Sequence, residues 1–134
     1  MKILNIGGEQ SDAHGVATAL RGVDQDVKVS WASRLELAAR WLDENRDLAA
    51  VVVEAQTNGD SWPSVLKHAR GPALHPAVVA IVPEGAGPPF EWLRPEPDDY
   101  IPRNGSLARD LPIVVTRAVA RTRGRQQVEL DDMR

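Results

Sequence analysis

The sequence predicts an open α/β fold, in which a parallel five-stranded sheet carries helices on both faces. Short apolar runs alternate with segments of helical period along the chain, which is the pattern of repeated βα units. Two of the runs, at 48–53 and 77–82, are apolar without interruption. Strands of this kind are buried on both faces, as in the middle of a parallel sheet. The length of 134 residues fits one domain.

The first half of the chain supplies three strands and two helices in this interpretation. The first strand covers residues 2–6 and is stopped by Gly7-Gly8. Ser11 or Asp12 caps a helix with apolar positions at helical spacing, namely Val16, Ala19, Leu20 and Val23. The second strand alternates around 27–31, and Ser33 caps a second helix. Its apolar face is assigned to Leu35, Leu37, Ala38, Trp41 and Leu42. The third strand then leads to Glu54.

The second half is less regular. A third helix is expected to start at Asp60 or Ser61, and 77–82 forms the fourth strand. Five prolines between 83 and 97 predict that the fourth helix is short or missing, because an interior proline costs a helix about 3 kcal/mol. Tyr100 and Ile101 give a short fifth strand. The last helix starts near 107 or 112, and its apolar stripe comprises Leu111, Val114, Val115, Ala118 and Val119.

Five βα units with buried third and fourth strands favour a right-handed, doubly wound, flavodoxin-like sheet with strand order 2-1-3-4-5. We expect residues 1–123 to form the domain and 124–134 to be a helical extension or linker.

The composition of the chain argues against several classes of function. A net charge of −3 argues against direct nucleic-acid binding, and no run is long enough to span a membrane. The absence of cysteine fits a reducing, cytoplasmic location. His14, His68 and His75 lie on separate segments, so we expect no metal site and no cofactor.

Over nearly its whole length the chain resembles the receiver (response-regulator) domain family of two-component systems and phosphorelays. Four blocks carry the resemblance by their order and separation: Lys2-Ile3-Leu4-Asn5-Ile6, Val51-Val52-Val53-Glu54, Gly59-Asp60 and Asp98-Asp99-Tyr100-Ile101-Pro102-Arg103. In that family an aspartate after the third strand is phosphorylated. An acidic pair after the first strand holds Mg²⁺, a hydroxyl follows the fourth strand, and a lysine follows the fifth. These groups supply oxygen ligands for a hard cation and balance the charge of the migrating phosphoryl group.

Carried over to this sequence, each of these positions has changed. The acidic pair falls on Gly7 and Gly8, and the acceptor position holds Glu54. The hydroxyl position falls on Ile81 or Val82, and the lysine position on Arg103. The resemblance therefore implies a pseudo-receiver, a signalling module that is not an enzyme and lacks the phosphorylation chemistry.

Three alternatives stay open at this point. Glu54 and Arg103 either form a permanent ion pair where the metal and phosphoryl group would sit, or both point to solvent. The chain could instead be an atypical phosphoacceptor that uses Glu54 or Asp60. The crevice beyond the strands could also bind a small ligand or a nucleotide.

The expected mode of action is protein contact. The predicted interaction surface is Tyr100 with the apolar stripe of the last helix, through which the domain would form a homodimer or bind a signalling partner. The sequence after residue 123 would then join it to an output domain.

Overall fold

A computed structural model describes residues 1–7, 10–33, 35–44, 47–54, 76–83 and 97–132. The first half comprises β1 (Lys2–Ile6), α1 (Gln10–Arg21), β2 (Lys28–Ala32), α2 (Leu35–Glu44) and β3 (Ala50–Glu54). The second half comprises β4 (Ala77–Val82), β5 (Asp99–Pro102) and the long helix α4 (Leu107–Asp132). The predicted third helix and the predicted short or missing fourth helix fall within 55–75 and 84–96, which lie outside the described residues.

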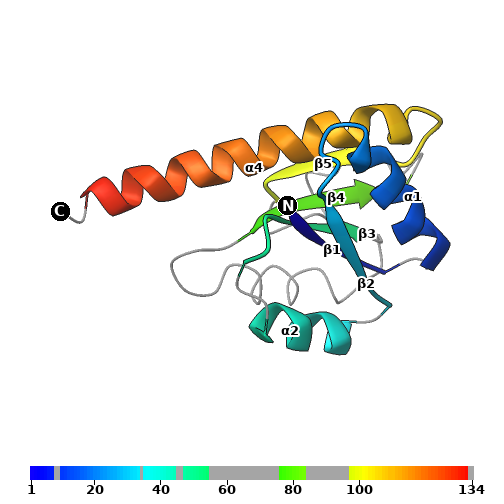
Figure 1. The fold of residues 1–134 in the computed structure, drawn as a ribbon, viewed down its shortest axis with the longest axis horizontal. Helices are drawn as coiled ribbons and strands as arrows, with labels where there is room; N and C mark the ends of the chain where they lie inside the picture. Colours follow the sequence, from blue (N-terminus) through cyan, green and yellow to red (C-terminus); the bar gives the residue numbers. More distant parts are fainter. Residues whose placement is uncertain (8–9, 34, 45–46, 55–75, 84–96, 133–134) are drawn as a thin grey trace.

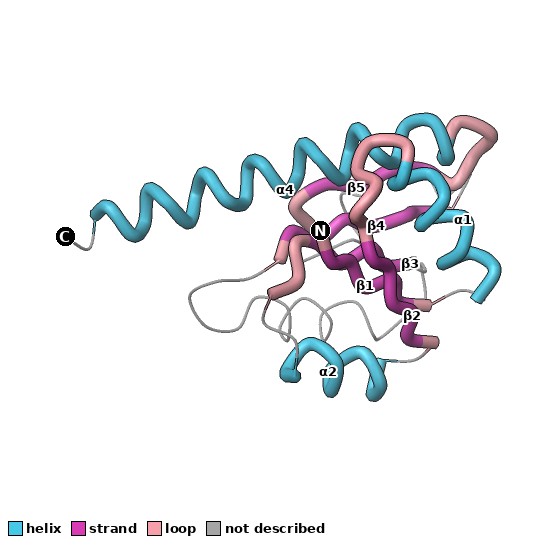
Figure 2. The backbone as a smooth tube through the Cα atoms, in the orientation of Figure 1, coloured by secondary structure: helices cyan, strands magenta, loops and turns pink. Residues whose placement is uncertain are grey.

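All five strands are parallel and lie in the order β2-β1-β3-β4-β5, which confirms the predicted sheet. Every residue of β4 is buried, and β3 is buried up to Glu54, because both strands have neighbours on either side. Figure 2 shows the strands in the middle of the molecule, with α1 and α4 on one side and α2 on the other. The sheet therefore separates two apolar cores, as expected from the alternation of side chains along each strand.

The core beneath α2 contains Leu4, Ile6, Val51 and Val53 from the sheet, and Trp41 packs against it. The core beneath α1 and α4 is larger and includes Ile3, Val52, Val79, Ile81 and Ile101 from the strands. Burying a side chain of this size contributes about 1.5–3 kcal/mol. The buried side chains of the strands thus stabilise the fold on both faces of the sheet.

Three predicted details of the helices were wrong. Helix α1 begins at Gln10, so Ser11 and Asp12 lie in its first turn and do not precede it. Val23 lies after the end of α1 and is 60% exposed, because the chain turns away at Gly22. Leu37 is 47% exposed, since the buried face of α2 is centred on Ala38 and Leu42, and Leu37 lies on its flank.

Two neighbouring aspartates fasten β5 to the rest of the domain. The Asp98 carboxylate accepts a hydrogen bond from the Val78 backbone N–H at 2.7 Å, which fixes the start of β5 against β4. The Asp99 carboxylate lies 2.8 Å from a guanidinium nitrogen of Arg117 and 2.8 Å from one of Arg121. Because both arginines belong to α4, Asp99 ties the edge strand to the helix that covers it.

Helix α4 is continuous from Leu107 to Asp132 and projects past the end of the sheet (Figure 1). Thr122 is 2% exposed, whereas Arg123 and Gly124 are exposed. The helix therefore leaves the domain after Thr122. Residues 123–132 extend it by about 15 Å at 1.5 Å per residue. In the described part of the chain, no helix combines the length and the apolar content that crossing a membrane requires.

Candidate functional site

The candidate site lies at the carboxyl edge of the sheet, where open α/β folds place their ligands. Glu54 is the last residue of β3, and Gly7 and Arg103 directly follow β1 and β5. The strand register brings these ends together, because Glu54 pairs with Ile81 on β4, which in turn pairs with Ile101 on β5. The backbone N–H of Arg103 donates to the Val82 carbonyl at 2.9 Å and continues this alignment past the end of β5.

Glu54 and Arg103 form an ion pair across this edge. Arg103 Nη2 donates to Glu54 Oε1, so the structure contains the pair that the sequence left as one of two alternatives. The Glu54 side chain is 12% exposed and that of Arg103 is 42% exposed. A charged carboxylate with so little contact with water must be stabilised by a nearby cation or by hydrogen-bond donors, because burial removes its hydration. Arg103 provides such a cation from a strand end 49 residues away in the sequence.

Gly7 closes the site from the β1 side in a backbone conformation that favours glycine. Its φ is 87°, in the left-handed region. A Cβ at this position would lie 3.2 Å from Glu54 Cβ, so a side chain would be both strained and crowded. The Gly7 N–H donates to the Ala32 carbonyl at 2.8 Å, and its carbonyl accepts from Trp31 Nε1 at 3.1 Å. The turn after β1 is thus fixed to β2 and lies against Glu54.

The other positions taken from the resemblance are placed as follows. Ile81 is 1% exposed and Val82 is 5% exposed, and neither carries a hydroxyl group. Gly8 lies outside the described residues, as do Gly59, Asp60, His68 and His75. His14 is exposed on α1. Among the residues that the structure describes, no three His, Asp or Glu side chains gather closely enough to bind a metal ion.

The predicted interaction surface was wrong for its helical part. The stripe of Leu111, Val114, Val115, Ala118 and Val119 is 0–9% exposed, because α4 packs this face onto its own sheet. Helical spacing identified an apolar face correctly but could not say whether the domain or a partner covers it. Tyr100, at 40% exposed, and Ile113, at 63%, are the large apolar side chains that stay accessible on β5 and α4 among the described residues.

Sequence reasoning assigned no role at the site to Asn5 or Trp31. Asn5 is fully buried in β1, and its side-chain oxygen and nitrogen have no hydrogen-bond partner among the described residues. It shares the face of β1 with Ile3, which belongs to the core beneath α1 and α4. The sequence signal that could have identified Asn5 is a polar residue between the apolar residues of β1. The Trp31 contact with Gly7 joins two strands, and no local pattern indicates it.

No protein family profile matches the sequence, and no curated protein matches it. Among solved structures, the chain is similar to the crystal structure of a response regulator receiver domain protein from Clostridium thermocellum. The TM-score is 0.68 at 20% sequence identity, and the match covers 91% of this chain and 96% of the other. The fold of this protein is therefore that of a receiver domain, a flavodoxin-like sheet with flanking helices.

Proposed function

We propose that this domain is a two-component-type signalling module that acts by protein contacts and takes no phosphoryl group. The observation that carries the proposal is the ion pair between Glu54 and Arg103 at the carboxyl edge of the sheet. A phosphoacceptor must have its carboxylate free to attack, whereas here a guanidinium already binds it. The positive charge that would stabilise a phosphoryl group is used to hold the resting carboxylate.

Two further features support the same conclusion. Transfer of a phosphoryl group needs a divalent cation held by several oxygen ligands. Gly7 offers no side-chain oxygen, and its positive φ and the nearby Glu54 side chain leave little room for a residue that carries one. Ile81 and Val82 fill the end of β4 with buried apolar side chains, which cannot donate a hydrogen bond to a phosphoryl oxygen. A working receiver domain, in the sense of the family that the sequence resembles, would need changes at all of these positions.

Incubation with Mg²⁺ and a small acyl phosphate tests this proposal. We expect the intact mass measured by mass spectrometry to stay unchanged, while a phosphorylatable receiver domain treated in parallel gains one phosphoryl group. Glu54→Gln serves as the matched variant, since it removes the nucleophilic carboxylate and keeps the shape of the side chain. A mass gain of one phosphoryl group that disappears in Glu54→Gln would overturn the proposal. A gain retained in this variant would place the acceptor elsewhere, for example at Asp60, and would overturn it as well.

For the protein contact, we propose that a second copy of this chain pairs with the projecting part of α4 in antiparallel orientation. Arginines stand at the start of this segment and acidic residues at its end: Arg123, Arg125, Glu129, Asp131 and Asp132. Antiparallel pairing centred on residue 127 sets Arg125 of one copy level with Glu129 of the other. Parallel pairing would align like charges along the whole segment. Opposite charges that face each other favour one orientation and suppress the other.

The mass in solution, measured by light scattering, tests this arrangement. We expect a dimer whose dissociation constant rises with salt, because exposed charge pairs are screened. Arg125→Glu should dissociate the dimer, because it places like charges level with each other. The double variant Arg125→Glu with Glu129→Arg should restore the dimer, because opposite charges face each other again. Arginine and glutamate have similar helix propensities, so the helix itself should be kept in both variants. Arg40→Glu on α2 is the control that changes net charge equally and should leave the mass unchanged. A monomer at all concentrations, or a dimer indifferent to Arg125→Glu, would contradict this mode of assembly.

A further inference from the structure

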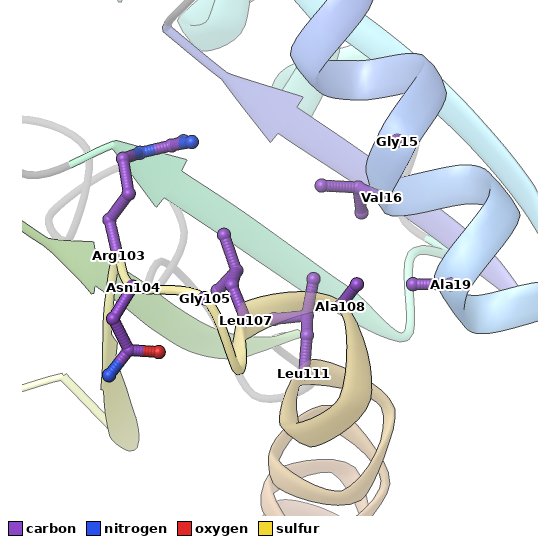
Figure 3. A pocket seen from close by; sticks show the side chains of 9 residues that line it. All are labelled: Gly15, Val16, Ala19, Arg103, Asn104, Gly105, Leu107, Ala108 and Leu111. Carbon is purple, nitrogen blue, oxygen red and sulfur yellow. The ribbon is translucent and has the colours of Figure 1, made fainter.

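A cavity of about 280 Å³ lies between α1 and the beginning of α4, next to the ion pair of the candidate site. Val16 and Ala19 line it from α1, and Leu107, Ala108 and Leu111 line it from α4. Figure 3 shows the leucine and valine side chains pointing into the space between the two helices. The guanidinium of Arg103 reaches over the same space from the end of β5, while the Asn104 side chain points away. The cavity is thus apolar inside, with one cationic group in its wall.

Two glycines line this space, Gly15 from α1 and Gly105 from the turn before α4. A Cβ built at Gly15 on α1, or at Gly105 before α4, would meet no atom within 4 Å. Helix α1 would be more stable by about 1 kcal/mol with alanine in place of Gly15. The sequence instead leaves the wall at this position without a side chain. A cavity of roughly 150 Å³ is known to accommodate benzene, so this one has room for a single ring with a short polar arm.

We propose that the cavity binds a small aromatic or alicyclic monocarboxylate, with the ring between α1 and α4 and the carboxylate on Arg103. The chemistry follows from the lining. Apolar walls favour a hydrocarbon ring, and a planar guanidinium with several donors recognises a carboxylate. Arg103 is the only charged residue among the described residues that line the cavity, so an anionic head group meets no carboxylate in the cavity wall. The bound carboxylate competes with Glu54 for the Arg103 nitrogen that now joins the two side chains.

Binding would therefore be coupled to the state of the ion pair. A ligand that takes over Arg103 releases Glu54 beside Gly7, whose backbone is fixed to Trp31 and β2. This gives the module an input other than phosphorylation. The proposal goes beyond the proposed function and stands apart from it, because ligand binding is measured without any phosphodonor. A gain of a phosphoryl group would contradict the proposed function only, and a lack of ligand binding would contradict the proposed cavity site only.

The test uses benzoate and phenylacetate as probes, with benzamide and phenylacetamide as uncharged counterparts of the same shape. Binding is followed by calorimetry and by chemical-shift changes of the ¹⁵N-labelled protein. For ligands of about ten heavy atoms we expect dissociation constants on the order of 0.1–1 mM. The acids should bind about tenfold more tightly than the amides, and Arg103→Met should abolish that difference. Glu54→Gln should bind the acids more tightly than the natural protein does, because the competing carboxylate is gone.

Two variants fill the cavity from opposite walls, so that one misfolded variant does not decide the result. Gly15→Leu adds a side chain from α1, and Gly105→Leu adds one from the turn before α4. Both should abolish binding. Ala120→Leu is the control, since it adds a leucine at an exposed position of α4 that does not line the cavity. Equal binding of acids and amides, unchanged binding in the filled variants, or no shift at about 10 mM probe would each overturn the proposal.

Discussion

Replacing Arg103 by methionine is expected to lower the free energy of unfolding by about 2 kcal/mol. Breaking a fully buried ion pair costs about 3–5 kcal/mol, whereas an exposed pair contributes about 0–1 kcal/mol. The Glu54–Arg103 pair lies between these limits, because its carboxylate is 12% exposed and its guanidinium is 42% exposed. The loss arises mainly at Glu54, whose charge stays in place after its cationic partner has gone. Urea unfolding followed by tryptophan fluorescence measures the change.

A double-mutant cycle separates the ion pair from the other contacts of the two residues. Glu54→Gln alone should cost about 1 kcal/mol, and the double variant should lose less than the two single losses added together. We expect a coupling energy of about 1–2 kcal/mol. Arg40→Met is the control, since Arg40 pairs with Glu44 on α2 with side chains 80% and 62% exposed, and its loss should change stability by less than about 0.5 kcal/mol. Equal effects of Arg103→Met and Arg40→Met, with additive losses in the cycle, would show that the pair contributes nothing specific.

The strands could be predicted from the sequence because their apolar runs are local features. The segment 77–82 is continuous in valine, isoleucine and alanine, and the structure has a strand with these bounds. The site followed from the topology, because the ends of parallel strands meet at one edge regardless of their distance along the chain. Glu54 and Arg103 could therefore be placed close together. Whether they form an ion pair depends on rotamers and exposure, which no sequence pattern determines.

The errors have a different physical origin. The stripe on α4 was assigned to a partner, although Val115 and Ala118 are fully buried against the sheet. An apolar helix face has the same sequence pattern in both cases, and only the position of the helix over the sheet distinguishes them. The cavity could not be predicted either, because its walls come from two separate elements, α1 and the beginning of α4. The part of α4 that follows Thr122 is mostly polar. This composition agrees with its position outside the domain, since a helix that projects into solvent needs no apolar face.

Replacing Asn5 by valine is expected to raise the free energy of unfolding, in contrast to the loss expected for Arg103→Met. Both polar atoms of its side chain are buried without a hydrogen-bond partner among the described residues. Each buried group of this kind costs about 1–3 kcal/mol in lost hydration. Valine suits a central strand and carries no polar atom. We therefore expect Asn5→Val to raise the free energy of unfolding by about 1–3 kcal/mol, which corresponds to a rise in Tm of roughly 4 °C per kcal/mol.

Two companion variants make this result specific to the unpartnered amide. Asn104→Val applies the same replacement to an asparagine whose Oδ1 accepts from the Ser106 N–H at 2.8 Å, just before α4. That variant should lose about 1 kcal/mol, as for the loss of a helix cap. Asn5→Asp should destabilise the domain by more than Arg103→Met does, because it places a charge in the core beneath α1 and α4. Thermal and urea unfolding should thus show a higher free energy of unfolding for Asn5→Val and a lower one for Asn104→Val and Asn5→Asp. A loss in Asn5→Val would show instead that the amide is hydrogen-bonded in solution and contributes to stability.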